Sequence, residues 1–398
     1  MIRVARAFLP VVLLAAVAFA GRAEAQAVPT IAGAFVGPEL LVADYEAMKD
    51  RCDPADTPDQ PARAFRDDQG NVHLVISGSN SRAFIGPTLD TATQNCHIIH
   101  ASPEDGDPSH FSNNQWLTSF YTADGRNIAS LVHTEFDGFS IVGACSPKSL
   151  KAFYANCWWN TITLALSSDS GADFSEAPPP KNLVAAPPYP YDPTNLKGPD
   201  GYNGPTEIVK WGNFYYALIN DWPFMLQQFG PCLIRSNNPF DAASWRAWDG
   251  SGFTIQFIDP YTAQNINPAQ HVCPPVFSGD AQSLVIDQAS GMFIATSFAE
   301  DTRYGSKPGV YLFVSRDLVH WSRATYGEGQ VAGSEGYATA SSARFSYSYF
   351  SLLDPTSSDM DFTTVSETPY LYFVRLDGNN APYGRTVFRR QLQMTITP

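Results

Sequence analysis

Residues 309–321, GVYLFVSRDLVHW, are the stretch that decides the fold. A run of aliphatic and aromatic residues, typical of a buried strand, leads into a Ser-x-Asp turn that ends in an aromatic residue. A second strand-like run lies just upstream, from Gly291 to Ser297. The unit is therefore a glycine turn, two strands and a polar turn.

The same unit recurs along the chain. Four further copies cover residues 70–77 with 82–85, 124–136 with 161–174, 212–219 with 232–245, and 369–374 with 386–391. A spacing of roughly 50 to 80 residues suits four-stranded blades, each of which buries its faces against its neighbours. Helical periodicity is hinted at only between Leu40 and Lys49. The pattern predicts an all-β chain folded as a five-bladed β-propeller. A two-sheet sandwich is the alternative, although single sandwich domains usually have about 100 residues.

The N-terminal residues predict an export signal. Two arginines precede an apolar run from Phe8 to Ala20, and small residues mark a cleavage point after Ala25. An apolar run of about 13 residues is shorter than the roughly 20 that a membrane-spanning helix needs. We therefore expect a secreted or periplasmic protein in which residues 26–60 pack as an N-terminal segment on a single propeller domain, residues 61–398.

The net charge disfavours one class of partner. It is −14 for the whole chain, and it becomes −16 when the three arginines and one glutamate before the cleavage point are removed. A surface this acidic repels phosphate backbones and anionic lipids. Neutral or cationic ligands, such as an oligo- or polysaccharide, fit better than nucleic acid, and no later stretch is apolar enough to span a membrane.

The cysteine count predicts disulfides. An even number of cysteines in an exported chain favours pairing, and all six lie beyond the cleavage point. Six cysteines can pair in 15 ways, and proximity along the chain favours the one that joins Cys52 to Cys96, Cys145 to Cys157, and Cys232 to Cys273. A cysteine metal site is the alternative, but no Cys-x-x-Cys or Cys-His group has zinc spacing. No cofactor or catalytic metal is expected, and a structural calcium ion stays open.

Three motifs resemble those of a known group of enzymes. They are SRDLVHW at 315–321, GNFYY at 212–216 after Gly204-Pro205, and ALSSDSG at 165–171. Together they are similar to the five-bladed propeller glycoside hydrolases of the arabinanase, β-xylosidase and invertase-like clans. The resemblance implies three carboxylates that project from the inner strands of the first three blades: a general base, a group that tunes the acid, and a general acid.

The chain departs from that family at the three positions themselves. Counting back from each inner-strand glycine, as in the arabinanase-like pattern, leads to Ala62–Arg63, Ser119 and Asn203, none of which is acidic. Glycosidic bonds break through an oxocarbenium-like state that needs a proton donor and an opposing carboxylate. Either the acids have moved, or the activity is different or lost.

Glu135 and His133 are the first candidates for relocated catalytic groups. Strand alternation in LVHTEF, residues 131–136, places both side chains on one face. Burial would raise the pKa of Glu135 toward the range in which an acid donates a proton. Glu207, which follows Asn203-Gly-Pro205, is the candidate for the second carboxylate. A solvated strand edge or a structural polar pair is the competing interpretation.

Six further residues are candidates for binding a glycan. Arginines can hold carboxylates or hydroxyl pairs, aromatic faces stack on sugar rings, and acids and amides at strand ends bind hydroxyls. The candidates are Arg63, Arg82, Trp159, Asn160, Asp280 and Asp354. For each, a turn, a surface ion pair or a place in the core is the structural alternative.

Two functions from different classes follow from these residues. The first is a secreted carbohydrate-active enzyme that acts on a glycan in the central funnel through a pair of carboxylates. The second is a non-catalytic propeller that binds a glycan or a protein partner. Convergence of two carboxylates in one funnel would favour the enzyme.

Overall fold

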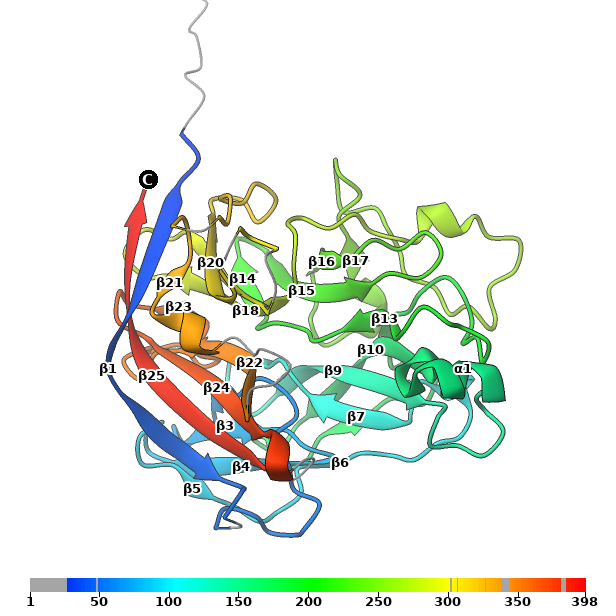
Figure 1. The fold of residues 1–398 in the computed structure, drawn as a ribbon, viewed down its shortest axis with the longest axis horizontal. Helices are drawn as coiled ribbons and strands as arrows, with labels where there is room; N and C mark the ends of the chain where they lie inside the picture. Colours follow the sequence, from blue (N-terminus) through cyan, green and yellow to red (C-terminus); the bar gives the residue numbers. More distant parts are fainter. Residues whose placement is uncertain are drawn as a thin grey trace, which may run out of the picture.

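The computed structural model is a closed ring of five β-blades. It describes residues 27–47, 49–300, 303–305, 307–325, 327–337, 344–380 and 384–398. The predicted export signal lies outside these residues. In Figure 1 the sheets follow one another in chain order around a common centre, which confirms the all-β, five-bladed architecture.

The first two blades contain residues 63–185. Blade 1 has the strands β2 (Arg63–Arg66), β3 (Val72–Ile76), β4 (Asn80–Gly86), β5 (Thr93–Gln94) and β6 (His100–Ala101). Blade 2 has β7 (Asn114–Leu117), β8 (Tyr121–Thr122), β9 (Ile128–Asp137), β10 (Trp158–Ser167), β11 (Ser175–Glu176) and β12 (Leu183–Ala185). Within each blade the strands are antiparallel, with β3 and β9 next to the innermost strands.

The next two blades contain residues 200–315. Blade 3 has β13 (Asp200–Asn203), β14 (Val209–Trp211), β15 (Phe214–Trp222), β16 (Gly230–Ser236) and β17 (Arg246–Ala247). Blade 4 has β18 (Ala281–Asp287), β19 (Phe293–Ala299) and β20 (Gly309–Ser315). A short parallel pairing of β10 with β13 joins blades 2 and 3 into one hydrogen-bonded sheet.

Blade 5 joins the two ends of the chain. Its strands are β22 (Phe345–Leu353), β24 (Tyr370–Asp377), β25 (Arg385–Thr397) and, on the outside, β1 (Thr30–Asp44). Figure 1 shows β1 in blue beside β25 in red. Two short strands, β21 (Val331–Ala332) and β23 (Thr364–Val365), pair in parallel with β1 and β18.

The N-terminal segment therefore differs from the expectation. Residues 30–44 are not an addition packed on the propeller, because they supply a strand of blade 5 that pairs with β25 along most of its length. The helical hint between Leu40 and Lys49 is wrong up to Asp44, where the chain is extended. An otherwise exposed edge of β25 is covered in this way, which favours a strand over a local helix.

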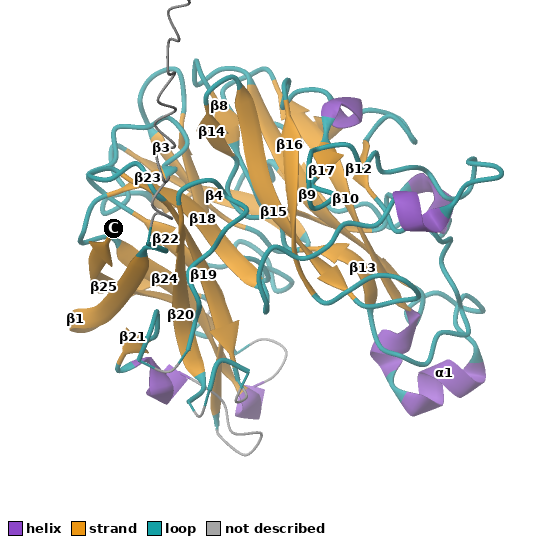
Figure 2. Ribbon diagram, turned by 90° about the horizontal axis from the view of Figure 1, so that it is seen from above, coloured by secondary structure: helices purple, strands orange, loops and turns teal. Residues whose placement is uncertain are grey.

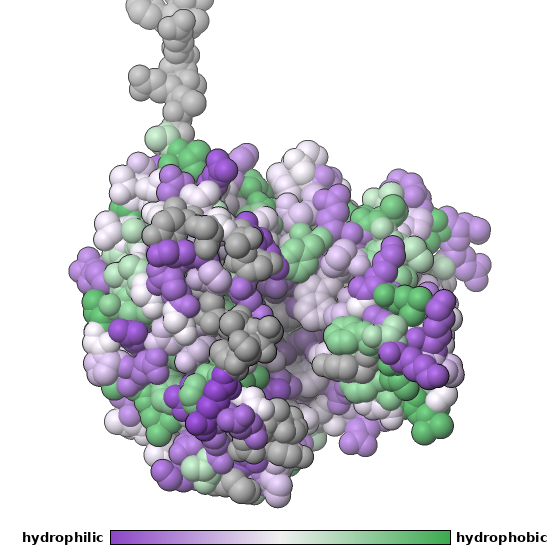
Figure 3. Space-filling model, in the orientation of Figure 1, coloured by the Kyte–Doolittle hydropathy of each residue, from purple (hydrophilic) through white to green (hydrophobic). Residues whose placement is uncertain are grey.

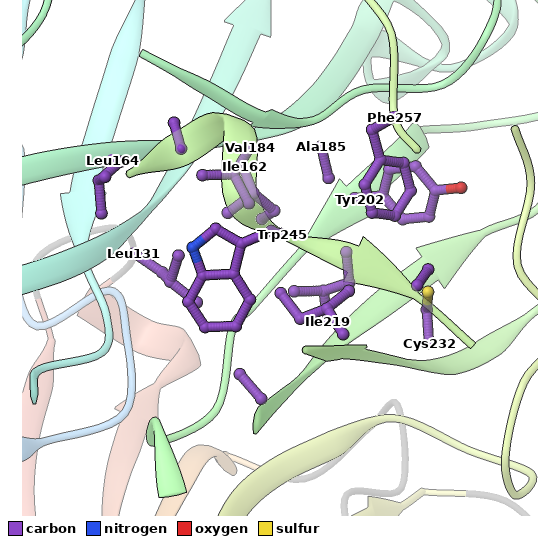
Figure 4. Packing of buried hydrophobic residues seen from close by; sticks show 14 of the residues in the cluster. Leu131, Ile162, Leu164, Val184, Ala185, Tyr202, Ile219, Cys232, Trp245 and Phe257 are labelled. Atoms are coloured by element: carbon purple, nitrogen blue, oxygen red, sulfur yellow. The ribbon is translucent and has the colours of Figure 1, made fainter. Parts of the chain in front are cut away.

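The hydrophobic core is divided into layers between neighbouring blades. Five apolar clusters fill the interfaces of blades 1 and 2, 2 and 3, 3 and 4, 4 and 5, and 5 and 1. Figure 4 shows the cluster between blades 2 and 3, where Trp245 packs near Leu131, Ile162 and Ile219. Because each blade is buried on both faces by its neighbours, the ring has to close for the core to be complete.

The predicted disulfide pairing is confirmed. The bonds join Cys52 to Cys96, Cys145 to Cys157, and Cys232 to Cys273. The second closes the loop that contains α1 (Pro147–Ala152), which lies at the periphery in Figure 2. Polar and apolar residues are interspersed over the face in Figure 3, and none of the described helices is long and apolar enough to cross a membrane.

Candidate functional site

A cavity of about 970 Å³ lies where the five blades meet. Every blade contributes to its wall, so the cavity occupies the axis of the ring. The residues that line it are Asp59, Gln60, Pro61 and Ser79 from the region of blade 1; Asn114, Trp116, His133, Glu135, Asp137 and Trp158 from blade 2; Asn203, Gly204, Asn220 and Trp222 from blade 3; Asp280, Ala281, Gln282, Phe298, Glu300 and Arg303 from blade 4; and Ser348 and Tyr349 from blade 5.

Strand β9 directs three ionisable side chains into this cavity. His133, Glu135 and Asp137 alternate along the strand, and all three line the wall. Alternation along a strand places residues two apart on the same face. The shared face predicted for His133 and Glu135 is therefore confirmed, and it extends by one further step to Asp137.

Hydrogen bonds fix the ring of His133. Its Nδ1 lies 2.8 Å from Nε2 of Gln60, which can only donate, so Nδ1 accepts and Nε2 carries the proton. Nε2 lies 3.1 Å from Oδ1 of Asn160 and 3.3 Å from Oε1 of Glu135. Burial lowers the pKa of His133 to about 4. The histidine is thus neutral near pH 7, and its Nε2–H donates to Asn160 Oδ1 with the Glu135 carboxyl close by.

Glu135 is held in an environment that favours its protonated form. Its exposed fraction is 7 %, and burial raises its pKa well above the usual range, with the negative charges of Asp137 and Asp59 adding to the rise. The side chain of Trp158 opposes the rise. A carboxyl of this kind can bear a proton at a pH where a solvated glutamate has lost it, which is the requirement for a general acid.

Two further carboxyls lie on the same side of the cavity. Asp59 accepts a hydrogen bond of 2.7 Å from the hydroxyl of Tyr349 and forms an ion pair with Arg385. Asp137 accepts one of 2.6 Å from the amide of Asn114, and burial raises its pKa to about 6. Asp59 is thus held by Tyr349 and Arg385, whereas the raised pKa of Asp137 allows it to gain or lose its proton near pH 6.

Asp280 enters the cavity from blade 4, which is not adjacent to blade 2. Burial raises its pKa to about 6, while the charge of Arg303 and a hydrogen bond from Trp222 oppose the rise. Its Oδ1 is buried with no hydrogen-bond partner in the described part of the chain. Asp280 and Glu135 are therefore two carboxyls that reach one cavity from different sides of the ring.

Aromatic rings and amides surround these acids. Trp158 and Trp222 lie edge to face with centroids 6.4 Å apart, and Trp116 lies 5.6 Å from the ring of His133. Among the described cavity atoms, Trp116 Nε1, Asp137 Oδ1 and Asn203 Nδ2 are buried without a hydrogen-bond partner. Rings for stacking, with unpaired donors and acceptors, match the needs of a polyhydroxylated ligand.

The structure does not bring Glu207 to Glu135. Its exposed fraction is 3 %, and it does not contribute to the described cavity wall. It forms an ion pair of 3.1 Å with Arg63 and accepts hydrogen bonds from Ser283 Oγ and the backbone N–H of Leu284. Its two carboxyl oxygens are bound by these protein groups, which accounts for its burial outside the cavity.

Arg63 lies beside Glu207 in the same buried centre, and its guanidinium contacts other protein groups instead of facing the cavity. Its Nε donates to the carbonyl of Thr118 in blade 2 at 3.0 Å, and its Nη2 donates to that of Gln282 in blade 4 at 2.7 Å. Nη1 pairs with Glu207 of blade 3. One guanidinium therefore links the innermost strands of four blades, which places Arg63 in the framework of the ring.

The other candidates fall into two groups. Asn160 does not reach the described wall itself but accepts the His133 N–H, so it positions that ring. Arg82 pairs with Asp53 and Asp56, and Trp159 packs with Phe111 and Tyr261 in the core. Asp354 accepts hydrogen bonds from Thr356 and Ser366 in a turn. None of these four lines the cavity within the described residues, whereas Asp280 does.

Several cavity residues were missed by the sequence reasoning. Asp137 could have been found by extending the β9 alternation one step beyond Glu135. Asp59 and Asn114 lie at the beginning of inner strands, where turn residues and site residues look alike in sequence. Tyr349 and Arg385 reach Asp59 from a distant part of the chain, and no local pattern marks that contact.

Metal binding in this cavity stays a sequence-based question. No three His, Cys, Asp or Glu side chains of the described chain come together as metal ligands. The cavity acids are instead bound or tuned by Arg, Tyr, Trp, Asn and His groups.

Comparison with known proteins gives structural likenesses only. No family model matches the chain, and no curated protein matches it. A catalytic domain of a Coprinopsis cinerea GH62 α-L-arabinofuranosidase is similar with a TM-score of 0.46 at 10 % identity, covering 92 % of this chain and 96 % of that chain. A putative exo-β-1,3-galactanase from Bifidobacterium bifidum has a TM-score of 0.48 at 10 % identity with the same coverage.

A third solved structure belongs to a different kind of enzyme. An N-acetylgalactosamine deacetylase from F. plautii, in complex with a blood group B trisaccharide, has a TM-score of 0.45 at 12 % identity, covering 90 % of this chain and 95 % of that chain. Identities this low, with TM-scores below 0.5, assign no activity to this chain.

Proposed function

We propose that the protein is an exported carbohydrate-active enzyme that hydrolyses a glycosidic bond of a glycan bound in the axial cavity. The observation that carries the proposal is the convergence of Glu135 and Asp280, from non-adjacent blades, in a cavity lined by tryptophans and amides. The three disulfides and the N-terminal export pattern support an extracytoplasmic location.

In the proposed reaction Glu135 is the general acid. It donates its proton to the glycosidic oxygen as the bond to the leaving sugar breaks. The carboxylate formed then accepts the N–H of His133, which lies 3.3 Å away. His133 is a positioning residue, because Gln60 and Asn160 hold its ring in place.

Asp280 supplies the second carboxylate in this scheme and takes the place predicted for Glu207. In its ionised form it faces the oxocarbenium-like centre, either as a base that activates water or as a nucleophile. Glu207 is unsuited to that step because Arg63, Ser283 and the backbone of Leu284 already bind it. A carboxyl separation of roughly 6.5 to 9.5 Å goes with inversion, and one of about 5 to 5.5 Å with retention.

Activity on arabinan, xylan and fructan, measured as released reducing sugar, tests the proposal. In Glu135→Gln and Asp280→Asn we expect kcat to fall by about 10² to 10⁴-fold, because each variant removes one proton-transfer or charge-stabilising group. Glu176→Gln is the matched control, since Glu176 is a half-buried glutamate of blade 2, outside the described cavity wall, with a pKa raised to about 7 by loss of solvation. Full activity in both cavity variants would remove these residues from the mechanism.

A glycan-binding propeller without catalysis is the second candidate. It is favoured by the absence of an acid at each position where the resembling family carries one: Ala62–Arg63, Ser119 and Asn203. Of these, Arg63 and Ser119 are bound to backbone carbonyls. Calorimetric binding of a glycan that the wild-type protein never cleaves, with equal affinity in Glu135→Gln, would favour this candidate over the enzyme.

A further inference from the structure

Two aspartates are buried together behind the cavity wall. Alternation along β13 and β15 places Asn203, Asn220 and Trp222 toward the cavity, whereas Asp221 lies on the opposite face. Asp221 stands across from Tyr202, and Asp200 precedes Tyr202 by two residues on the same face. The exposed fractions of Asp200 and Asp221 are 3 % and 1 %.

Within the part of the chain that the structure describes, no positive side chain forms an ion pair with Asp200 or Asp221 or lowers the pKa of either. Burial and then the charge of Asp192 raise the pKa of Asp200, while burial raises that of Asp221, with the charge of Asp200 adding to the rise and hydrogen bonds from Gln227 and a backbone N–H opposing it. Nearby Tyr191 and Tyr202 are influenced by the same carboxyls and bring no charge near neutral pH. An isolated carboxylate in the protein interior is costly, so the pair has to acquire positive charge from outside, as protons or as a cation.

Unpaired oxygens point to a cation. Asp221 Oδ2 and Gln227 Oε1 are both buried and have no hydrogen-bond partner within the described residues. Gln227 is fixed against the other oxygen of Asp221 by a hydrogen bond from its Nε2. One oxygen of Asp200 accepts from Asn195 at 3.3 Å, which leaves lone pairs free for a further partner.

We propose that Asp200, Asp221 and Gln227 bind one Ca²⁺ ion between blades 2 and 3. The donors are two carboxylates and one amide oxygen, the hard oxygen ligands that Ca²⁺ prefers, and backbone carbonyls and water can complete a coordination number of six to eight. Soft transition metals are disfavoured because the set contains neither thiolate nor imidazole.

The ion would stabilise the wall of the axial cavity. Asp221 stands in β15 between Asn220 and Trp222, both of which line the cavity. Asp200 pairs in parallel with Trp159 at the junction of blades 2 and 3. A ligand set drawn from β13, β15 and the loop after β15 thus connects that junction to the cavity wall. This site is separate from the carboxyls at the axis and does not depend on the proposed hydrolysis.

Calcium titration of the EDTA-treated full chain tests the site. By isothermal calorimetry we expect one Ca²⁺ per chain, and at a hundredfold excess over Kd a rise in Tm of about 3 to 8 °C. Since buried carboxyls have to release protons before they bind metal, Ca²⁺ should also release protons into a weakly buffered solution at pH 7. These measurements need no substrate, so their results can be distinguished from a failure of the proposed hydrolysis.

Two variants give the comparison. Asp221→Asn should fold, because an amide resembles a protonated carboxyl in shape, and it should lose both the Tm shift and the calorimetric signal. Asp354→Asn, which alters an equally buried aspartate in a turn of blade 5, should keep both. The inference is overturned if the wild-type protein binds no Ca²⁺ and its Tm is the same with CaCl₂ and with EDTA, since the carboxyls then hold protons.

Discussion

At the scale of single residues, environment separates two buried glutamates that look alike in sequence. Glu135 lies beside Asp137 and Asp59, and burial with like charges favours its protonated form. Glu207 lies against Arg63 and two hydrogen-bond donors, which hold its carboxyl away from the cavity. Carboxyls with such different surroundings can take different roles, and of these two glutamates Glu135 is the one that lines the cavity.

The charge of Asp137 should set the pH dependence of activity. Because this charge raises the pKa of Glu135, Asp137→Asn should lower that pKa and move the alkaline limb of kcat/KM to lower pH. The shift should be clearest above about pH 6, where Asp137 is ionised. Profiles of kcat/KM against pH measure it, with the exposed Asp124→Asn as the control. An alkaline limb that moves to higher pH would contradict the assignment.

Glu207→Gln should destabilise the fold more than it alters the cavity. It leaves the guanidinium of Arg63, with an exposed fraction of 2 %, without its counter-ion, and losing one partner of a buried pair costs about 3 to 5 kcal/mol. Urea denaturation measures the loss, and the exposed Glu367→Gln should stay within about 0.5 kcal/mol of wild type. Unchanged stability together with lost activity would instead indicate that Glu207 takes part in the proposed reaction.

At the scale of elements, alternation and turn residues located most strands. The repeat predicted strands over 128–136, 214–219 and 310–314, and the structure has β9 at Ile128–Asp137, β15 at Phe214–Trp222 and β20 at Gly309–Ser315. Strand β1 was missed because its pairing partner, β25, lies at the other end of the chain. Local pattern identifies a strand, but it does not identify the neighbour.

The junction of β10 and β13 should be sensitive to one added methyl group. Gly201 has a φ of +92°, and a Cβ there would lie 2.1 Å from the carbonyl oxygen of Asn160. Gly201→Ala should therefore cost clearly more than the roughly 1 to 2 kcal/mol of left-handed strain alone. Gly212→Ala is the matched control, because its φ is +59° and no atom lies within 4 Å. Equal denaturation midpoints for the two variants would contradict this expectation, because β10 and β13 would then move apart to admit the methyl group without loss of stability.

At the scale of the whole molecule, the ring explains both the core and the site. Each of the five apolar clusters needs two neighbouring blades, so a gap between any two would expose one cluster entirely. The same closure brings Asp59, Glu135, Asp280 and Tyr349 to one axis from four blades. The shape of the fold is therefore what assembles the cavity.

Stability should be greatest in mildly acidic solution when calcium is chelated. Acids with raised pKa values, about 6 for Asp280, 7 for Asp361 and 9 for Asp221, contribute stability that is full below the unfolded value of about 4 and is lost as the pH rises through the folded values. His133 acts oppositely: its folded pKa of about 4 makes its contribution full above about 6.5 and lost as the pH falls.

Thermal unfolding in EDTA from pH 3.5 to 9 provides the measurement. The Tm should pass through a maximum between about pH 4 and 6 and then decrease toward pH 9, since the acids with raised pKa values lie mainly above that window. A maximum at pH 8 or above would contradict the burial of these groups as neutral acids.

The sequence alone determined the features that depend on neighbours along the chain. These are the all-β class, the count of five repeats, the three disulfide pairs, and the common face of His133 and Glu135. Strand periodicity and turn chemistry are local, so they can be recognised before the chain is folded.

Only the tertiary structure decided which residues meet. Arg63 binds the carbonyl of Gln282, 219 residues away, and Glu207 joins that buried centre instead of the cavity. Asp280 reaches the axis opposite Glu135, and β1 completes the last blade. The reason is physical: pKa values, ion pairs and edge pairing depend on distances across the closed ring, and those distances exist only once all five blades have packed.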